Sequence, residues 1–531
     1  MKYLVRNITI PVSKKDDIAM LRRLASRELG VSEKQVSSIS IFRRSLDARK
    51  KNDLRYVYTV ECEVSGVVTG SKNVSAGESY RYDIPRPESI PDNRPVVAGF
   101  GPAGMFAALV LAEAGLKPIV LERGGPVEQR SRAVEEFWRG GALDTECNVQ
   151  FGEGGAGTFS DGKLNTGTSD LRLRWVFSQF VSAGAPRDIM YDAKPHIGTD
   201  LLPGIVKALR QRIIALGGEV RFFSRLESLD IRSGTLCGVN IHTPEGGEYL
   251  ECDRLILAVG HSARDTFRML LETGVPMAPK AFSMGARIEH LQTMTDMAQY
   301  GADRASLGLP PADYKLSCFV ENNTGGKTGV YTFCMCPGGQ VVAAASESGR
   351  IVTNGMSRRA RNGENSNAAV LVSAAPEIFP YDGVLGGMLW QQEIERRAFE
   401  AAGGTYRAPA QLVGDFLAGR PSAGQTDVAP SYLPGVSWGD IRRVLPPVIT
   451  GAMAKALPVF GRKLRGFDVP GAVLTAPETR SSSPVRILRN DGLMSDIRGL
   501  FPCGEGAGYA GGISSAAVDG VRCAEAVIRS Y

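Results

Sequence analysis

A glycine-rich turn between a strand and a helix constrains the fold of this chain more than any other feature of its sequence. Residues 95–125 read PVVAGFGPAGMFAALVLAEAGLKPIVLERGG, a pattern that predicts a strand, a turn, an apolar helix and a second strand. The turn has the form G-x-G-x-x-G, and its residues include Gly99, Gly101, Pro102, Ala103 and Gly104. The first glycine permits the tight turn, the second lets the backbone approach a pyrophosphate, and the third lets the helix pack on its strand. The sequence therefore predicts a βαβ unit that binds a dinucleotide at the start of its helix.

An acidic residue, Glu122, ends the second strand of this unit, about 20 residues after the turn. Its carboxylate can accept hydrogen bonds from ribose hydroxyls and would repel a 2′-phosphate, so FAD or NAD is favoured over NADP. A glycine turn that binds no ligand is the alternative. The combination of strand, helix and terminal acid makes that alternative the weaker one.

Three further segments resemble the flavoproteins with two dinucleotide-binding domains, and this resemblance favours FAD over NAD. They are LERGG at 121–125, which contains Arg123, LILAVG at 255–260, which ends at Gly260, and LFPCGEGAGYAGGISSAAVDG at 500–520. The resemblance implies an FAD domain that is split along the chain and closed by its last segment. In that segment Glu505, after Gly504, would bind a ribityl hydroxyl, although the family more often has Asp there. Amides near Gly511, Gly512 and Ile513 would face the flavin pyrimidine edge, where reduction develops negative charge.

The chain is also similar, along nearly its whole length, to a bacterial family of FAD-dependent dehydrogenases, the NAD(FAD)-utilising dehydrogenases, that has no settled reaction. The similar segments lie at 147–164, 194–202, 260–267, 331–339, 354–369 and 477–487. The similarity implies the flavin fold and leaves the substrate open.

The loop GEGGAGTFSDG at 152–162 is too rich in glycine for a core element. Its residues Gly154, Gly155, Thr158 and Ser160 are candidates to bind phosphate or flavin oxygens, and simple turn formation is the alternative. Cys147, just before the loop, is better interpreted as a small buried residue than as a reactive thiol.

Candidate catalytic residues follow the strand that ends at Gly260, because open α/β sheets bind ligands at the carboxyl ends of their strands. His261 is expected to donate a proton or to hydrogen-bond the flavin, with Arg264 beside it, and helix capping or solvated pairing is the alternative. Arg480 is expected to orient an anionic substrate, with an ion pair to Glu478 as the alternative.

Other polar residues receive plainer interpretations. His290 is expected to be a packed or surface histidine, and the basic run SRRAR at 357–361 a solvated loop. Cys334 and Cys336 are interpreted as two thiols on one strand face, near the distance limit for a bridge.

Composition excludes several classes of protein. Nine cysteines without regular spacing indicate reduced thiols, and the four histidines show no metal-ligand spacing, so no metal is expected. No long apolar run is present, and we expect a cytoplasmic protein without a membrane segment. Residues 1–60 contain 14 Lys and Arg against 6 Asp and Glu, a net charge of +8 that exceeds the +6 of the whole chain.

The expected fold class is α/β, a split Rossmann-like FAD-binding domain with an inserted mixed α+β substrate domain and a small N-terminal βαββ, ferredoxin-like module. The expected segments are a basic module at 1–90, the first FAD part at 91–275, a substrate domain at 276–470 and the last FAD part at 471–531. A proline-rich stretch, IPRPESIPDNRP at 84–95, predicts the linker.

The expected function is that of an FAD-dependent oxidoreductase, a dehydrogenase or reductase that transfers hydride between non-covalently bound FAD and a small, anionic molecule. Only one nucleotide fingerprint is complete, so NAD(P)H is considered solely as a transiently bound electron donor. The alternative function is an RNA-directed flavoenzyme or a flavin-bearing binding protein that uses the basic module. Few aromatic residues in that module favour a solvated basic hairpin instead, and the oligomeric state stays open.

Overall fold

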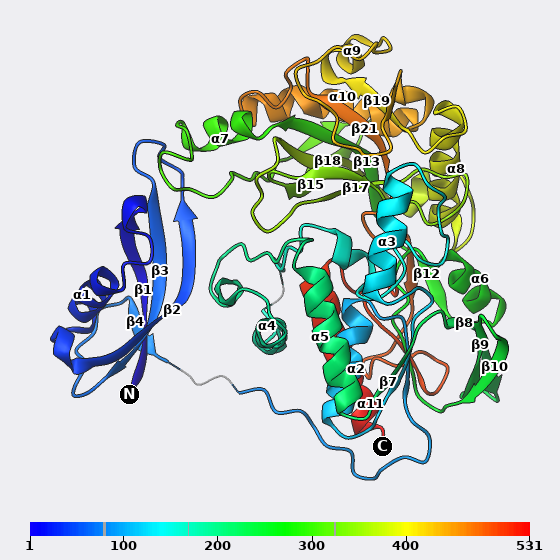
Figure 1. The fold of residues 1–531 in the computed structure, drawn as a ribbon, viewed down its shortest axis with the longest axis horizontal. Coiled ribbons are helices and arrows are strands. Elements are labelled where there is room, and N and C mark those ends of the chain that lie inside the picture. Colours follow the sequence, from blue (N-terminus) through cyan, green and yellow to red (C-terminus); the bar gives the residue numbers. More distant parts are fainter. Residues whose placement is uncertain (78–80, 168, 323–324) are drawn as a thin grey trace.

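The computed structural model describes residues 1–77, 81–167, 169–322 and 325–531. The molecule belongs to the mixed α/β class, as the sequence predicts. Figure 1 shows a small module formed by the N-terminal segment at the left, a parallel sheet with its helices at the lower right, and a larger, mostly antiparallel sheet above it.

The parallel sheet combines strands from distant parts of the chain. Its order is β23 (Leu500–Pro502), β11 (Leu255–Leu257), β5 (Val96–Ala98), β6 (Ile119–Leu121) and β7 (Glu219–Arg221). Each neighbouring pair is parallel, so the carboxyl ends of the strands meet at one edge. Because β23 is an edge strand, the sheet is complete only with the last residues of the chain.

Both faces of this sheet are covered, which explains why β23, β11, β5 and β6 are apolar throughout, whereas the edge strand β7 is not. Alternate residues, among them Val97 and Ile256, pack in one cluster with α2 (Pro102–Glu113), α5 (Leu202–Ala215) and α11 (Ile513–Arg529). Their neighbours in sequence, such as Val96 and Leu255, pack in a second cluster on the other face. That cluster includes residues of β8 (Arg225–Arg232), β9 (Thr235–Thr243) and α6 (Arg264–Glu272), and β10 (Gly246–Glu251) pairs with β9.

The second large sheet has seven strands. Their order is β14 (Ser317–Glu321), β15 (Lys327–Cys336), β18 (Asn365–Ala374), β13 (Phe282–Leu291), β21 (Val473–Glu478), β19 (Ala408–Leu412) and β20 (Val436–Trp438). The interior strand β21 lies beyond residue 470, so the last segment of the chain contributes to both large sheets. Three helices lie around this sheet in Figure 1: α8 (Gly386–Ala401), α9 (Val413–Ala418) and α10 (Pro447–Lys463).

Shorter elements complete the body. They are α3 (Val127–Trp138), α4 (Arg172–Ser182), α7 (Gln292–Tyr300), the pair β12 (Met277–Pro279) and β22 (Val485–Ile487), and the pair β16 (Gln340–Ala343) and β17 (Thr353–Met356). Among the helices that the structure describes, none combines the length and the apolar character needed to cross a bilayer.

The N-terminal module contains β1 (Lys2–Pro11), α1 (Ile18–Leu29), β2 (Val36–Asp47) and β3 (Arg55–Val64), followed by a short strand, β4 (Val74–Ala76), that the sequence pattern does not predict. One of its basic residues, Arg44, pairs with Asp192 of the body through Nε at 2.8 Å and Nη2 at 3.0 Å. Leu54, just before β3, packs with Tyr300 and Leu309. These two contacts attach the module to the body. One of the basic residues of the module, Arg44, is therefore already bound to an acidic residue of the same chain.

Candidate functional site

A cavity of about 450 Å³ lies between the carboxyl ends of the parallel strands and the seven-stranded sheet, within the size range of small-molecule sites. Most of the residues predicted to bind a cofactor or to act in catalysis line it. They are Gly99, Gly101, Pro102, Ala103, Glu122, Arg123, Gly155, Ser160, Gly260, His261, Arg480, Glu505, Gly511, Gly512 and Ile513. Five others lie outside its lining: Gly104, Gly154, Thr158, Arg264 and Gly504.

The glycine turn leaves open space at the start of α2. Gly99 has φ +97°, and a Cβ atom there would lie 2.4 Å from the Ala258 carbonyl oxygen, so the turn excludes a side chain. A Cβ atom on Gly104 would lie 1.9 Å from the Gly99 carbonyl oxygen, which explains how the helix packs so closely on its strand. At Gly101 the nearest atom to a Cβ would be Gly155 Cα at 3.7 Å. The start of α2 therefore has room for a bound diphosphate.

Glu122 is buried at the edge of the cavity and is held by three backbone amides. Its Oε2 accepts from Phe100 N at 2.8 Å, and its Oε1 accepts from Gly124 N at 2.9 Å and Gly152 N at 2.8 Å. Each carboxylate oxygen has lone pairs for more than one donor, so the side chain keeps acceptor capacity toward the cavity. Arg123 stacks over Phe151, with its guanidinium carbon 4.1 Å from the ring centre.

The start of α11 also lies at the cavity, and α11 packs closely against α2 at Gly520. A Cβ atom on Gly520 would lie 2.0 Å from the Ala103 carbonyl oxygen, so only glycine allows this approach. Gly512 is the N-cap residue of α11, and Gly511, Gly512 and Ile513 line the cavity. Gly504 was expected to contact the cofactor, but its amide donates to Asp519 Oδ2 at 2.8 Å and it lies behind the lining.

The glycine-rich loop at 152–162 has a mainly structural role. The Gly154 amide donates to the Phe100 carbonyl at 2.8 Å and so ties the loop to the glycine turn. Thr158 is buried, and its hydroxyl donates to the Glu153 carbonyl at 3.3 Å. Thr158 thus lies outside the cavity lining, and its expected contact with phosphate or flavin oxygens stays a prediction. Ser160 does line the cavity, although its hydroxyl donates to the Gly157 carbonyl at 2.7 Å.

His261 and Glu505 form a pair of titratable groups in the cavity. Their closest atoms, His261 Nε2 and Glu505 Oε1, are 4.0 Å apart, and His261 Nδ1 lies 3.1 Å from the Ser262 hydroxyl. Burial, followed by the charges of Arg480 and Arg264, lowers the pKa of His261 to about 3. Burial raises the pKa of Glu505 to about 7. At neutral pH the imidazole is therefore neutral and Glu505 is partly protonated, so the exchangeable proton lies on Glu505 rather than on His261, where we had expected it.

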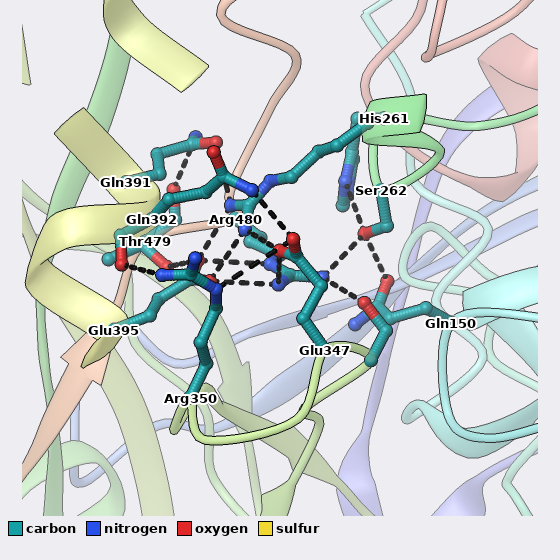
Figure 2. Close-up of polar contacts among 12 residues, drawn as sticks. Gln150, His261, Ser262, Glu347, Arg350, Gln391, Gln392, Glu395, Thr479 and Arg480 are labelled. Atoms are coloured by element: carbon teal, nitrogen blue, oxygen red, sulfur yellow. Dashed lines mark hydrogen bonds and ion pairs between the residues drawn. The ribbon is translucent and has the colours of Figure 1, made fainter. Parts of the chain in front are cut away.

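Arg480 lies in a buried network of ion pairs (Figure 2). It donates to both oxygens of Glu395, at 3.0 and 2.8 Å, and to the hydroxyls of Ser262 at 3.1 Å and Ser346 at 2.5 Å. Its remaining N–H group points to Glu347 Oε2 at 3.5 Å. These contacts use all five N–H groups of the guanidinium. Arg480 borders the cavity, but in this structure no N–H group remains to bind a substrate carboxylate.

Arg264 shares the Glu395 carboxylate from the other side. It donates to Glu395 Oε2 at 2.7 Å and to Oε1 at 2.8 Å, and it also pairs with Glu347. Arg264 is fully enclosed and does not reach the cavity, so its predicted catalytic role is replaced by a positioning role behind Arg480. The two guanidinium groups keep the pKa of Glu395 well below its ordinary value.

The predicted alternative partner of Arg480, Glu478, was wrong. Glu478 pairs with Arg287 of β13, whose Nη2 donates to Glu478 Oε1 at 3.0 Å and whose Nε also donates to this carboxylate.

The interpretations of His290 and Cys147 as buried residues agree with the structure. His290 is buried and outside the cavity, with Nε2 at 2.7 Å from the Phe467 carbonyl oxygen. Cys147 is buried, and burial raises its pKa.

A second charged cluster was missed by the sequence analysis. Asp161 of the glycine-rich loop lies 2.9 Å from Lys163 Nζ and accepts from Arg361 Nε at 3.0 Å. Ser357 donates to the same carboxylate. The run SRRAR was expected to be solvated, yet Ser357 and Arg361 are buried. The sequence did contain one signal for this cluster: Asp161 is an acidic residue inside a glycine-rich loop, and a buried carboxylate needs a cationic partner.

A cluster of Cys503, Asp519 and Cys523 has the spacing of possible metal ligands, with ligand atoms within 4.8 Å of one another. The guanidinium of Arg489 already lies there, donating to Asp519 Oδ1 at 2.7 Å and to Cys523 Sγ at 3.5 Å. The guanidinium of Arg489 is thus the cation that this cluster binds in the structure.

Comparison with known proteins gives matches along the whole chain. A family model described as "FAD-dependent protein, C-terminal domain-like" matches residues 281–481, and a domain of unknown function matches residues 1–63. An uncharacterized protein of Clostridium beijerinckii is 45% identical over 539 residues, which cover 99% of each chain. The family match supports FAD, and nothing in these matches supports NAD(P)H.

Solved structures give weaker similarities. Glycine oxidase from Bacillus cereus is 12% identical over 82% of this chain and 95% of that chain, with a TM-score of 0.34. A geranylgeranyl bacteriochlorophyll reductase-like protein from Thermoplasma acidophilum is 12% identical over 81% of this chain and 76% of that chain, with a TM-score of 0.35.

Proposed function

Because the chain belongs to the same family as the Clostridium beijerinckii protein, a family of FAD-dependent flavoproteins, we propose that it is an oxidoreductase that transfers hydride between non-covalently bound FAD and a small molecule. One observation carries this proposal. A single cavity joins the glycine turn at the start of α2, the carboxylate of Glu122 and the start of α11 to a wall of polar side chains from the second sheet.

The cavity residues fit FAD in their chemistry. The turn at Gly99 and Gly101 leaves space for the diphosphate at a helix N-terminus, and Glu122 offers acceptor capacity for the adenosine ribose. The start of α11, at Gly512, offers partial positive charge for the flavin. When bound, FAD supplies the two-electron chemistry, and the protein provides orientation, charge and proton transfer.

The protein's own groups have distinct roles in this proposal. Glu505 holds a proton close to neutral pH, and neutral His261 lies beside it to exchange that proton or to hydrogen-bond a substrate. Arg480 and Glu395 fix the cavity wall, because every polar atom of the Arg480 guanidinium is bonded. Lys163 and Lys315 also line the cavity, and their charge favours an anionic small molecule.

The RNA-directed alternative is not favoured. The family match points to an FAD-dependent protein, and Arg44 of the basic N-terminal module is bound to Asp192 of the body rather than free for phosphates.

The proposal is tested by a substitution that fills the diphosphate space without disturbing the fold. Gly101 has φ −75°, so a side chain there is not strained, and it would extend toward the cavity. We expect Gly101→Val to lose FAD while its circular dichroism stays unchanged. Gly451→Val, at an exposed position of α10 with no atom within 4 Å of its Cβ, is the matched control and should keep the cofactor.

Cofactor content is measured from the absorbance of the pigment released by acid precipitation, with about one FAD expected per wild-type chain. Wild-type protein that cannot be loaded with FAD, or Gly101→Val that retains it, would refute the assignment. The substrate is then sought by following flavin bleaching in a screen of small carboxylates and phosphates.

A further inference from the structure

Two cysteines of β15 lie where this strand is distorted beside the cavity. Phe333 pairs with Ala369 of β18 and Cys336 pairs with Asn367, so β15 advances three residues while β18 advances two. This is a β-bulge, and Cys334 within it has φ +43°, a conformation that is rare for residues other than glycine. Cys334 lines the cavity, whereas Cys336 is fully buried.

The two sulfur atoms are neighbours. The Cys336 thiol donates to the Cys334 carbonyl oxygen at 3.2 Å, which keeps the Cys336 sulfur beside Cys334. In a regular strand, residues two apart have Cα atoms about 6.6 to 7 Å apart, which is the upper limit for a disulfide. A bulge bends the strand locally, so this pair is not held at the regular spacing.

The charges around the pair favour one thiolate. Lys163 Nζ lies 4.0 Å from Cys336 Sγ and 2.9 Å from Asp161, and Arg361 is bound to the same Asp161. Two cations thus share one carboxylate, and a thiolate would balance the second cation. The neighbouring Cys336 thiol, with Lys163 and Arg287 nearby, holds the pKa of Cys334 well below its ordinary value. The neighbouring Cys334 sulfur and burial raise the pKa of Cys336.

We propose that Cys334 and Cys336 form a redox-active pair that exchanges reversibly with a small disulfide entering the cavity. This goes beyond the proposed flavin function and does not depend on it, because thiol–disulfide exchange needs no cofactor. It also goes beyond the sequence interpretation, in which Cys334 and Cys336 were two thiols on one strand face.

The reaction has two steps. The Cys334 thiolate attacks a disulfide R–S–S–R, forming a mixed disulfide and releasing RS⁻. Cys336 then loses its proton to a released thiolate and attacks the Cys334 sulfur, which forms the internal disulfide and expels the second RS⁻. The pair loses two electrons, and the small disulfide is reduced to one thiol and one thiolate.

The test uses the full-length protein in buffers of reduced and oxidised glutathione, followed by acid quenching, alkylation and tryptic mass spectrometry. Cleavage after Lys327 and Arg350 gives the peptide 328–350, which contains both cysteines and no other. We expect this peptide to lose both alkyl groups and 2 Da as the buffer becomes oxidising. Cys336→Ser should instead stop at a mixed disulfide between Cys334 and glutathione.

Cys318→Ser is the matched control, since Cys318 lies on the adjacent strand β14 and is half-buried, but burial raises its pKa. This variant should behave as wild type. A wild-type peptide that keeps two alkylated thiols in fully oxidised buffer, or that forms only mixed disulfides with glutathione, would overturn the proposal.

A second measurement addresses reactivity rather than bridge formation. At pH 7, iodoacetamide should alkylate Cys334 at least about tenfold faster than Cys318, because only the thiolate reacts. Lys163→Gln should remove most of that difference. Equal rates in the wild-type protein would overturn the proposal, whatever the FAD content measured on the same sample.

Discussion

Loss of the charge on Glu395 should destabilise the protein strongly. In Glu395→Gln the shape is kept, but Arg264 and Arg480 lose the carboxylate that receives two hydrogen bonds from each of them. Glu395 is fully buried, and Glu347 alone would face both guanidinium groups. Removing one partner from a buried ion pair costs about 3 to 5 kcal/mol, because it leaves an uncompensated charge. We expect a loss of that size in the free energy of unfolding.

The assay is urea unfolding followed by tryptophan fluorescence, since Trp390 is buried on the same helix, α8. Glu393→Gln is the control on that helix, because Glu393 pairs with Arg396 and Arg397 at the surface, where such pairs contribute about 0.3 to 0.5 kcal/mol. A loss below about 1 kcal/mol for Glu395→Gln, similar to that of the control, would refute the view that this carboxylate holds the network together.

Three further outcomes are expected. Glu122→Ala removes charge-assisted hydrogen bonds of about 1.5 to 3 kcal/mol, so titration of the apoprotein should show FAD bound roughly 10- to 150-fold more weakly. Glu505→Gln should be as stable as wild type below about pH 4, where Glu505 is protonated in both states, and more stable at neutral pH. Because burial raises the folded pKa from 4.5 to about 7, the difference in thermal unfolding should grow between these two pH values and then level off, at an upper bound of about 3 kcal/mol. Arg480→Lys keeps a charge but loses the planar fork, so stopped-flow measurements should show slower flavin reduction at full FAD occupancy, and unaltered rates would leave Arg480 with a purely structural role.

Local sequence patterns were sufficient to predict the glycine turn. Gly99 has the positive φ that the motif requires, and Gly104 allows the close packing of the helix on its strand. Glu122 lies at the predicted strand end. These features depend on residues within about 30 positions of one another, where strand and helix periodicity are informative. The mixed α/β class follows from the same patterns.

Ion pairs between distant segments could not be predicted in this way. Arg361 and Asp161 are 200 residues apart, and Arg480 and Glu395 are 85 apart. In sequence, Arg361 belongs to a run of basic residues, which is typical of a solvated loop. The acid nearest to Arg480 in sequence is Glu478, but Glu478 is the last residue of β21 and pairs with Arg287 inside the seven-stranded sheet, whereas Arg480 lies beyond the end of the strand. These ion pairs form because the fold buries the charged side chains beside segments that are distant in sequence.

The edge position of β23 has a consequence for synthesis of the protein in the cell. Leu121 and Leu500 lie in one sheet but are separated by almost 380 residues, which a ribosome adds in about 20 to 80 s. Throughout that time the apolar surface of α2 that α11 covers is open to water, and β11, once it has been made, lacks a neighbour on one side until β23 is added. The emerging chain is therefore exposed to aggregation for longer than a domain built from one continuous segment, and a nascent chain arrested before Gly512 would lack the second helix start at the cavity.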